Sequence, residues 1–189
     1  MSSLWRVFPW DPSGRAGGPY SPGYLPAQSG QGRFDLPLEG NASSWYFAET
    51  PEHAVGEKIQ DLRGQSLADE FLLERGHRLA LCPVELADGV AISDFCNPSQ
   101  LVKRDVLPDR LAYRDRDVTR AIVRRLHEGN PHVAGFRWWS ALFGEWHTRV
   151  LFSDRLPEDA LSCGEPEPLF PGTPAVVAAC GWLGIETGG

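Results

Sequence analysis

The sequence lacks the motifs that define several common classes of nucleotide-binding and metal-dependent protein. It has no G-x-G-x-x-G and no G-x-x-x-x-G-K-[S/T] segment, so neither a dinucleotide-binding Rossmann unit nor a P-loop is indicated. It has no H-E-x-x-H segment, and its five histidines are scattered along the chain, which favours structural or surface roles for them. No apolar run approaches the roughly 18 residues that a membrane-spanning helix needs, so we expect no membrane segment.

An excess of positive charge is also missing, because 18 Lys and Arg residues stand against 25 Asp and Glu residues, for a net charge of −7. Nucleic-acid-binding proteins usually have a basic balance, so direct binding to nucleic acid is not expected. A small anionic ligand is still possible, because the local field of a pocket can be positive in an acidic protein.

Cysteine is sparse and unpaired in the sequence. The four cysteines, Cys82, Cys96, Cys163 and Cys180, form no C-x-x-C motif, which argues against a structural zinc site. The N-terminal segment has no long apolar region of the kind that signal peptides carry, so we expect a cytoplasmic protein. Free thiols are the rule in that compartment, and we predict free cysteines.

The chain has the size and composition of one soluble globular domain. Its 189 residues are enough to bury a substantial core, and 42% of them are hydrophobic. We find no internal repeat and no linker that would divide the chain, so residues 1–189 are predicted to form a single domain. Residues 11–44 are rich in Gly, Pro and Ser, which predicts long loops, and their aromatic residues argue against plain disorder.

Apolar spacing predicts a mixture of helices and strands without a regular βαβ series, and therefore an α+β (mixed α/β) fold with a small curved sheet. Thr50 and Pro51 predict the start of a helix that runs to about Leu62. Further predicted helices are 66–76, 117–127 and one helix or turn over 173–179. Predicted strands are 44–48, 77–86, 90–95, 136–140 and 148–152, and Pro83 predicts an edge or a bulge in the second of them.

Four short segments carry side chains suited to binding or catalysis. They contain Arg6 in an apolar strand, Arg33 in a Gly-Arg-Phe-Asp loop, Tyr46 and Glu57 at the ends of a strand–cap–helix unit, and Ser140 after an aromatic strand. Each also has a purely structural interpretation. The arginines suit solvent-facing charges, Glu57 lies opposite the apolar stripe of its helix, and Ser140 suits a core or turn position. On the residues alone, both interpretations stay open.

The order and spacing of these segments resemble the RES domain, whose name records an arginine, a glutamate and a serine. The resemblance runs from Leu4 to about Ile185. Its most specific part is Tyr-x-Ala-x-Thr-Pro-x-x-Ala-x-x-Glu, from Tyr46 to Glu57. Two segments depart from the family pattern. The usual Gly-Gly-Arg-Trp-Asn loop reads Gln-Gly-Arg-Phe-Asp here, and Trp138-Trp139 stands where the family often has a single tyrosine-like aromatic.

The resemblance implies a fold related to ADP-ribosyltransferases and a bacterial toxin that is neutralised by an Xre-type helix-turn-helix antitoxin. Members of the family deplete NAD⁺ by hydrolysis or phosphorolysis, and some are ADP-ribosyl transferases. The implied substrate is therefore NAD⁺, with no metal. Carried over by position, Glu57, Ser140 and Arg6 are the implied catalytic residues, and Arg6, Arg33, Tyr46 and Ser140 the implied NAD⁺-binding residues.

The chemistry of these side chains suits that reaction. Arginine binds phosphate through charge-assisted hydrogen bonds, and a tyrosine ring can stack on nicotinamide. A glutamate stabilises the cation-like ribose centre formed when the glycosidic bond breaks, and a serine can hydrogen-bond the ribose or the glutamate. Two alternatives stay open, namely a protein ADP-ribosyltransferase and a non-catalytic NAD-binding or interaction protein. A homodimer is the commonest default assembly for such a chain.

Overall fold

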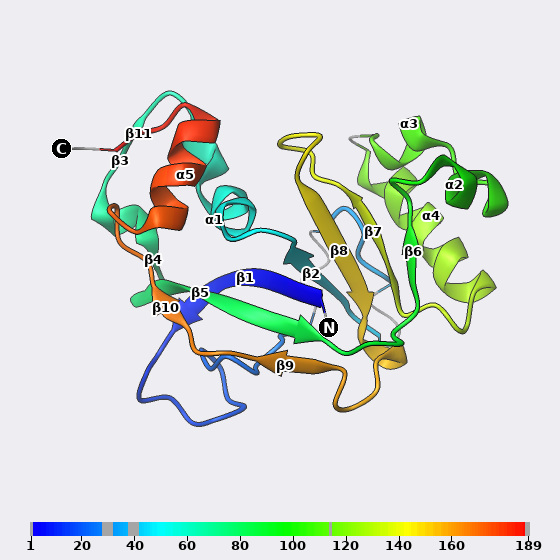
Figure 1. Cartoon of the computed structure of the whole chain (residues 1–189), viewed down its shortest axis with the longest axis horizontal. Helices are drawn as coiled ribbons and strands as arrows, with labels where there is room; N and C mark the ends of the chain where they lie inside the picture. The colour runs from blue at the N-terminus through cyan, green and yellow to red at the C-terminus, as the bar shows by residue number, and fades with distance from the viewer. Residues whose placement is uncertain (1, 28–31, 38–41, 114, 188–189) are drawn as a thin grey trace. The chain divides into compact units, whose positions relative to one another are not determined.

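The structure is a computed structural model that describes residues 2–27, 32–37, 42–113 and 115–187. The chain divides into two compact units, each built from separate stretches of sequence. The first unit contains Met1–Tyr24, Phe47–Leu86 and Leu161–Gly189, and the second contains Leu25–Tyr46 and Ala87–Ala160. Both units combine helices with strands, and most strand pairs in the described part of the chain are antiparallel, so the predicted α+β class is confirmed (Figure 1).

The first unit is built around strand β5 (His77–Leu86), which has the bounds predicted from its apolar residues. Strand β1 (Ser2–Trp10) pairs with it antiparallel along nine residues, from Ser2 opposite Leu86 to Trp10 opposite Arg78. The other edge of β5 pairs with three short strands, β4 (Leu73–Glu74), β9 (Leu161–Cys163) and β10 (Glu167–Pro168).

Pro83 lies in neither an edge strand nor a free end, since β5 has partners on both sides. Strand β9 pairs with residues 84–86 and β10 with residues 80 and 81, so Pro83 lies where one partner strand gives way to the other. A proline has no N–H to donate, and this position needs only its carbonyl, which accepts from Gly164 N at 2.9 Å. Of the two alternatives predicted from Pro83, an edge or a bulge, the edge is therefore wrong, and the bulge stays a prediction.

Two helices, α1 (Pro51–Ile59) and α5 (Pro174–Leu183), complete the first unit and pack against each other (Figure 1). Thr50 caps α1 through its hydroxyl, which accepts from His53 N, and a 3₁₀ turn (Gln60–Leu62) extends the helix as predicted. Gly184 ends α5 in the left-handed conformation that favours glycine, with φ of 67°. Strand β11 (Glu186–Thr187) follows and pairs with β3 (Ser66–Leu67).

The helix predicted over residues 66–76 is wrong. Ser66 does not cap a helix, because it lies in β3 and donates its hydroxyl hydrogen bond to Glu186. Asp69–Leu72 form a short 3₁₀ turn, and β4 follows directly. Arg75 and Gly76, with φ of 53° and 81°, make the tight turn that returns the chain into β5, so Gly76 serves a hairpin and not a helix end.

In the second unit, strand β7 (Gly135–Trp139) is flanked by β8 (His147–Phe152), which is antiparallel, and β6 (Ile92–Asp94), which is parallel. Three helices accompany these strands, α2 (Pro98–Lys103), α3 (Pro108–Leu111) and α4 (Arg116–Gly129). Helices α2 and α3, which are short, were not predicted from the sequence. Helix α4 begins slightly earlier than predicted, because Asp115 is the capping residue and accepts from Asp117 N at 2.9 Å.

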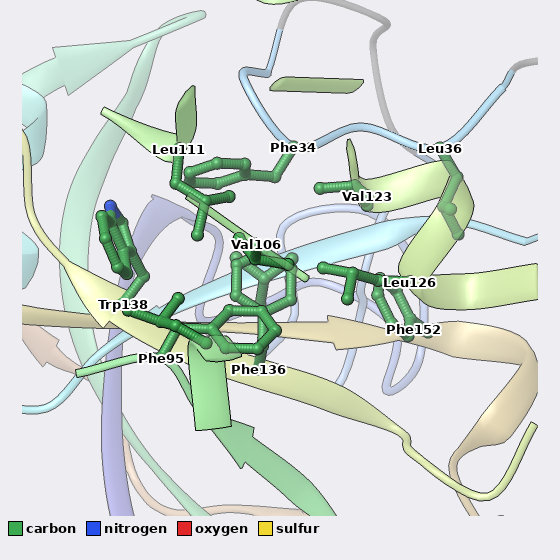
Figure 2. Close-up of a cluster of buried hydrophobic side chains, with 12 residues drawn as sticks. Phe34, Leu36, Phe95, Val106, Leu111, Val123, Leu126, Phe136, Trp138 and Phe152 are labelled. Atoms are coloured by element: carbon green, nitrogen blue, oxygen red, sulfur yellow. The ribbon is translucent and has the colours of Figure 1, made fainter. Parts of the chain in front are cut away.

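The core of the second unit joins its loop, helices and strands. Twelve buried side chains form one cluster (Figure 2), namely Phe34, Leu36, Phe95, Leu101, Val106, Leu111, Val123, Leu126, Phe136, Trp138, Val150 and Phe152. Phe34 comes from the loop after Gly32 and meets Phe136 edge to face, with 5.3 Å between ring centroids. The burial of Phe34 fixes the loop on which Arg33 and Asp35 lie.

Strand β2 (Ser44–Ala48) belongs to both units, since Ser44–Tyr46 fall in the second and Phe47 and Ala48 in the first. Within the first unit, Ala48 pairs with Trp5 of β1. The segment before β2 has the loop structure predicted for it, because neither a helix nor a strand occurs in residues 11–27, 32–37 or 42–43. Predicted loop residues 28–31 and 38–41 lie outside the described part of the chain.

Candidate functional site

Glu57 lies on the outer side of α1, where helical periodicity predicts it. Ala54, Val55 and Ile59 of the same helix are buried, whereas the Glu57 side chain is 44% exposed. A carboxylate in such a position faces solvent and is within reach of a ligand.

The Glu57 carboxylate is nevertheless held by neighbours one turn away on each side. His53 Nε2 lies 3.0 Å from Glu57 Oε1, and Gln60 Nε2 donates to Glu57 Oε2 at 3.4 Å and to its carbonyl at 3.0 Å. The His53 side chain is almost fully buried, at 1% exposure. A fixed imidazole beneath an exposed carboxylate restricts the rotamers of that carboxylate, so Glu57 is oriented before any ligand arrives.

Arg6 lies in the middle of β1, also in the first unit. Its Nη1 donates to the carbonyl of Tyr24 at 2.9 Å, and its guanidinium lies over the Phe8 ring at 4.5 Å from the centroid. Burial lowers the pKa of Arg6, although guanidinium stays charged in proteins. Arg6 is therefore a half-buried cation in contact with its own unit, and not a charge pointing freely to solvent.

Arg33 is bound to the backbone of the second unit. Its Nη2 donates to the carbonyls of Leu111 and Tyr113 at the end of α3, and its own carbonyl accepts from Thr119 Oγ1 on α4 at 2.6 Å. The loop that carries Arg33 is thereby joined to two helices. The interpretation of Arg33 as a simple surface charge does not hold.

Tyr46 takes part in a compact hydrogen-bond network with the same loop. Its hydroxyl donates to Asp35 Oδ1 at 2.8 Å and accepts from Phe34 N at 2.9 Å, while Gly32 N donates to Asp35 Oδ2 at 2.8 Å. Burial, followed by the adjacent Asp35 carboxylate, raises the pKa of Tyr46 well above its ordinary value. The phenol is therefore a neutral hydrogen-bonding group whose ring is part-exposed on β2.

Ser140 follows directly after β7 and is buried, at 8% exposure. Its N–H donates to the carbonyl of Trp146 at 2.7 Å, and its Oγ accepts from Leu142 N at 3.0 Å. These contacts match a serine that shapes a turn, which is the structural interpretation of this residue. They fix the position of the hydroxyl oxygen at the end of the strand.

The five predicted residues thus fall into two groups, each described within its own unit. Arg6 and Glu57 belong to the first unit, and Arg33, Tyr46 and Ser140 to the second. In the second group, the Gly32–Asp35 loop links Arg33 and Tyr46 by direct contacts, whereas the hydrogen bonds of Ser140 given above join it to other residues.

Two residues that were not predicted from the sequence contact the predicted ones, namely His53 and Asp35. His53 was expected to be a structural or surface residue, and it is buried, as a structural residue is. It also contacts Glu57, and its position four residues earlier on the same helix is the signal that was available for this pairing. Asp35, which holds Tyr46, had no such signal, because eleven residues separate the two along the chain.

A groove of about 500 Å³ in the second unit, between α3 and α4, has none of these residues in its lining. It is lined by Asp105, Leu107, Arg110, Val118, Ala121, Ile122 and Arg125. Among the described residues, no group of three or more His, Cys, Asp or Glu side chains is arranged to hold a metal ion. No described helix is both long enough and apolar enough to span a membrane.

Comparison with known proteins identifies a family for this chain and a solved structure of similar fold. A search of curated proteins gives no match. Among solved structures, the chain is similar to one in the crystal structure of the M. tuberculosis MbcT–MbcA toxin–antitoxin complex, with 16% sequence identity and a TM-score of 0.62. That similarity covers 90% of this chain and 85% of the other, and it supports the fold. The family model of the RES domain matches residues 3–170, and the chain therefore belongs to the RES-domain family.

Proposed function

We propose that this protein consumes NAD⁺ by cleaving the bond between nicotinamide and ribose. The observation that carries the proposal is the Glu57 carboxylate, which is exposed to a ligand and yet oriented by the buried His53 and by Gln60. Exposed carboxylates on helices usually rotate freely. One that is fixed in this way is suited to stabilise charge as it develops in a reaction.

The proposed reaction breaks the bond between C1″ of the ribose and the nicotinamide nitrogen. The bonding electron pair leaves with nicotinamide, which becomes neutral, and the ribose carbon acquires cationic character. Glu57 stabilises that cation and orients the attacking oxygen. With water as the acceptor, the products are nicotinamide, ADP-ribose and a proton, whereas inorganic phosphate gives ADP-ribose-1″-phosphate.

The other residues that the family pattern names are proposed to bind and position the substrate, and the contacts of each are given within its own unit. Arg6 and Arg33 supply positive charge for the two phosphates, as guanidinium groups commonly do. Tyr46 offers a part-exposed ring for the nicotinamide or ribose, and its neutral hydroxyl is locked by Asp35. Ser140 contributes a fixed oxygen for a ribose hydroxyl. No step of the proposed reaction needs a metal.

We further propose that this NAD⁺ consumption is toxic to its host and is neutralised by a helix-turn-helix antitoxin of the Xre type. Membership of the RES family supports this role, as does the fold shared with a chain of a toxin–antitoxin complex. The acidic balance of the chain, with a net charge of −7, fits a protein that leaves DNA contacts to its partner.

The test is consumption of NAD⁺ by the purified protein, with and without inorganic phosphate, followed by identification of both products. Release of nicotinamide supports the proposal, and the second product names the acceptor. Acceleration by phosphate together with ADP-ribose-1″-phosphate identifies a phosphorylase, and ADP-ribose identifies a hydrolase. Stable NAD⁺ with a folded protein contradicts the proposal, and transfer of radiolabelled ADP-ribose to protein in a cell extract would then identify the alternative transferase.

A further inference from the structure

Three side chains of the first unit share one face of its sheet. Arg6 of β1 lies directly opposite Cys82 of β5, and Cys163 of β9 lies directly opposite Val84 of the same β5. Residues opposite each other on antiparallel strands point to the same face, and so do residues two apart on one strand. Because Cys82 and Val84 are two apart, Arg6, Cys82 and Cys163 all point to that face.

The two thiols are neighbours across the β5–β9 pair. Cys82 Sγ lies 3.4 Å from the carbonyl of Gly164, the residue after Cys163, and the two thiols interact electrostatically. Gly164 permits this approach, because a Cβ at its position would lie 2.8 Å from the Pro83 ring. Cys163 is the last residue of the three-residue strand β9, and a disulfide to Cys82 would bring the two sulfurs to about 2.05 Å.

The two thiols differ in pKa and in exposure to solvent, and these differences assign each a separate role. The hydrogen bond from Cys82 and the nearby charge of Arg6 lower the pKa of Cys163, despite the opposing effect of burial. The same pairing, together with burial, raises the pKa of Cys82. Cys163 is part-exposed and Cys82 is fully buried. Cys163 is thus the nucleophile within reach of solvent, and Cys82 is the thiol behind it.

We propose that Cys163 and Cys82 form an oxidation site that closes to a disulfide beside Arg6 when it meets a hydroperoxide. The Cys163 thiolate attacks one oxygen of hydrogen peroxide, the O–O bond breaks, and the products are a Cys163 sulfenic acid and hydroxide. Cys82 sulfur then attacks Cys163 sulfur and displaces that oxygen, which leaves as water with the Cys82 proton. In total, two thiols and one peroxide give one disulfide and two waters.

Oxidation at this site would change the charge near Arg6, because both thiols interact electrostatically with its guanidinium. Disulfide formation removes the thiolate, so Arg6 loses a negative neighbour. The oxidation itself does not depend on the proposed reaction with NAD⁺. It is therefore testable in a protein that proves to have another activity.

The experiment treats the reduced full-length protein with hydrogen peroxide, blocks the remaining thiols with iodoacetamide, and maps peptides without reduction. The expected result is loss of two of the four alkylatable thiols and a cross-linked peptide that contains Cys82 and Cys163. Cys96 and Cys180 stay alkylated. A disulfide between any other pair of cysteines overturns the proposal. So does oxidation of Cys96 or Cys180 before Cys82 and Cys163, and so does a protein that keeps all four thiols alkylatable.

Variants assign the order of attack. Cys82→Ser is expected to accumulate a Cys163 sulfenic acid that dimedone traps, and Cys163→Ser to abolish both the trapped adduct and the cross-link. Cys180→Ser, which removes another buried thiol of the same unit, should form the cross-link as the parent does. Dimedone labelling of Cys82 in the Cys163→Ser variant would contradict the assigned roles. Should Cys82→Ser fail to fold, the peptide map of the parent protein still decides whether the disulfide forms.

Discussion

His53 Nε2 lies 3.0 Å from Glu57 Oε1, one turn away on α1, and the imidazole is almost fully buried whereas the carboxylate is exposed. Because the His53 side chain is held by the surrounding core, its contact restrains the exposed carboxylate of Glu57. Residues four apart on a helix point to the same side, so the pairing follows from the sequence once the helix is placed. The relationship makes His53 a positioning residue for the proposed reaction.

Replacing His53 should lower turnover more than substrate binding. We expect His53→Ala to reduce kcat by about 10-fold, with a smaller change in KM, because the carboxylate is no longer oriented. His53→Gln should recover part of the activity, since an amide can also donate to Glu57. The pH profile of kcat should change shape in both variants. His132→Ala removes an exposed histidine and serves as the control. A His53→Ala variant that folds and keeps the parental kcat and pH profile would exclude this role.

Replacing Glu57 tests the centre of the proposed site. Glu57→Gln keeps the size and the hydrogen-bonding capacity of the side chain but removes its charge, so stability should change by less than about 0.5 kcal/mol. NAD⁺ consumption should fall by about 100-fold or more, as expected when charge stabilisation of a transition state is lost. Glu52→Gln, on the first turn of the same helix, is the matched control. Equal rates for the parent and Glu57→Gln would refute the assignment of Glu57.

The elements predicted correctly from sequence are those whose signal is local. Strand β5 and helix α1 were placed by apolar spacing, by the Thr50 cap and by Pro51, which act within a few residues. The error over residues 66–76 has the opposite cause. There Ser66 finds its partners in β11, 120 residues away along the chain, and this long-range pairing overrides a local resemblance to a helix cap.

The same distinction applies to the candidate site. The family pattern named Glu57 and Tyr46 because their spacing is specific, and helical periodicity alone predicted that Glu57 faces outward. The partner of Tyr46 is Asp35, which periodicity cannot reveal because it lies in a loop. The contacts of Arg33 with Leu111 and Tyr113 are more distant still, because the residue numbers of the partners differ by 78 and 80. The Asp35–Tyr46 contact and the contacts of Arg33 could be identified only from the folded structure.

Removing the Tyr46 hydroxyl should reduce stability in a pH-dependent way. Tyr46→Phe leaves the buried Asp35 carboxylate without one donor and Phe34 N without its acceptor, at a cost of about 1–3 kcal/mol. The raised pKa sets the sign of the pH dependence. The contribution is complete below the unfolded tyrosine pKa of about 10 and is lost as pH rises above it, since only the unfolded chain then releases the proton.

Urea unfolding of the parent and of Tyr46→Phe at neutral pH and above pH 10 measures this effect. The difference in unfolding free energy between the two proteins should be largest at neutral pH and should shrink as the solution becomes more alkaline. Tyr113→Phe, on an exposed residue of the same unit, is the control and should show little difference at either pH. A Tyr46→Phe difference that grows with pH would contradict the assigned proton.

Gly32 provides the most stringent test of the loop that carries Arg33. A Cβ at this position would lie 2.3 Å from Asp35 Oδ1 and 2.4 Å from the Tyr46 hydroxyl, closer than atoms can approach. Asp35 is only 3% exposed, so its carboxylate cannot swing into solvent to make room. We therefore expect Gly32→Ala to separate Asp35 from Tyr46 and to destabilise the protein by about 1–3 kcal/mol, as overpacking of a tight site does.

Gly144→Ala is the matched control for Gly32→Ala in the same unit, because a Cβ at residue 144 would meet no described atom within 4 Å beyond its chain neighbours. Thermal melting and NAD⁺ turnover, measured on both variants, separate the effects. The expected result is that melting temperature and turnover fall for Gly32→Ala and not for Gly144→Ala. This result would support a network in which Asp35 binds Tyr46 only when residue 32 has no side chain. Parental values for both variants would mean that the Asp35–Tyr46 hydrogen bond does not form in solution, because the added methyl group and that hydrogen bond cannot occupy the same space.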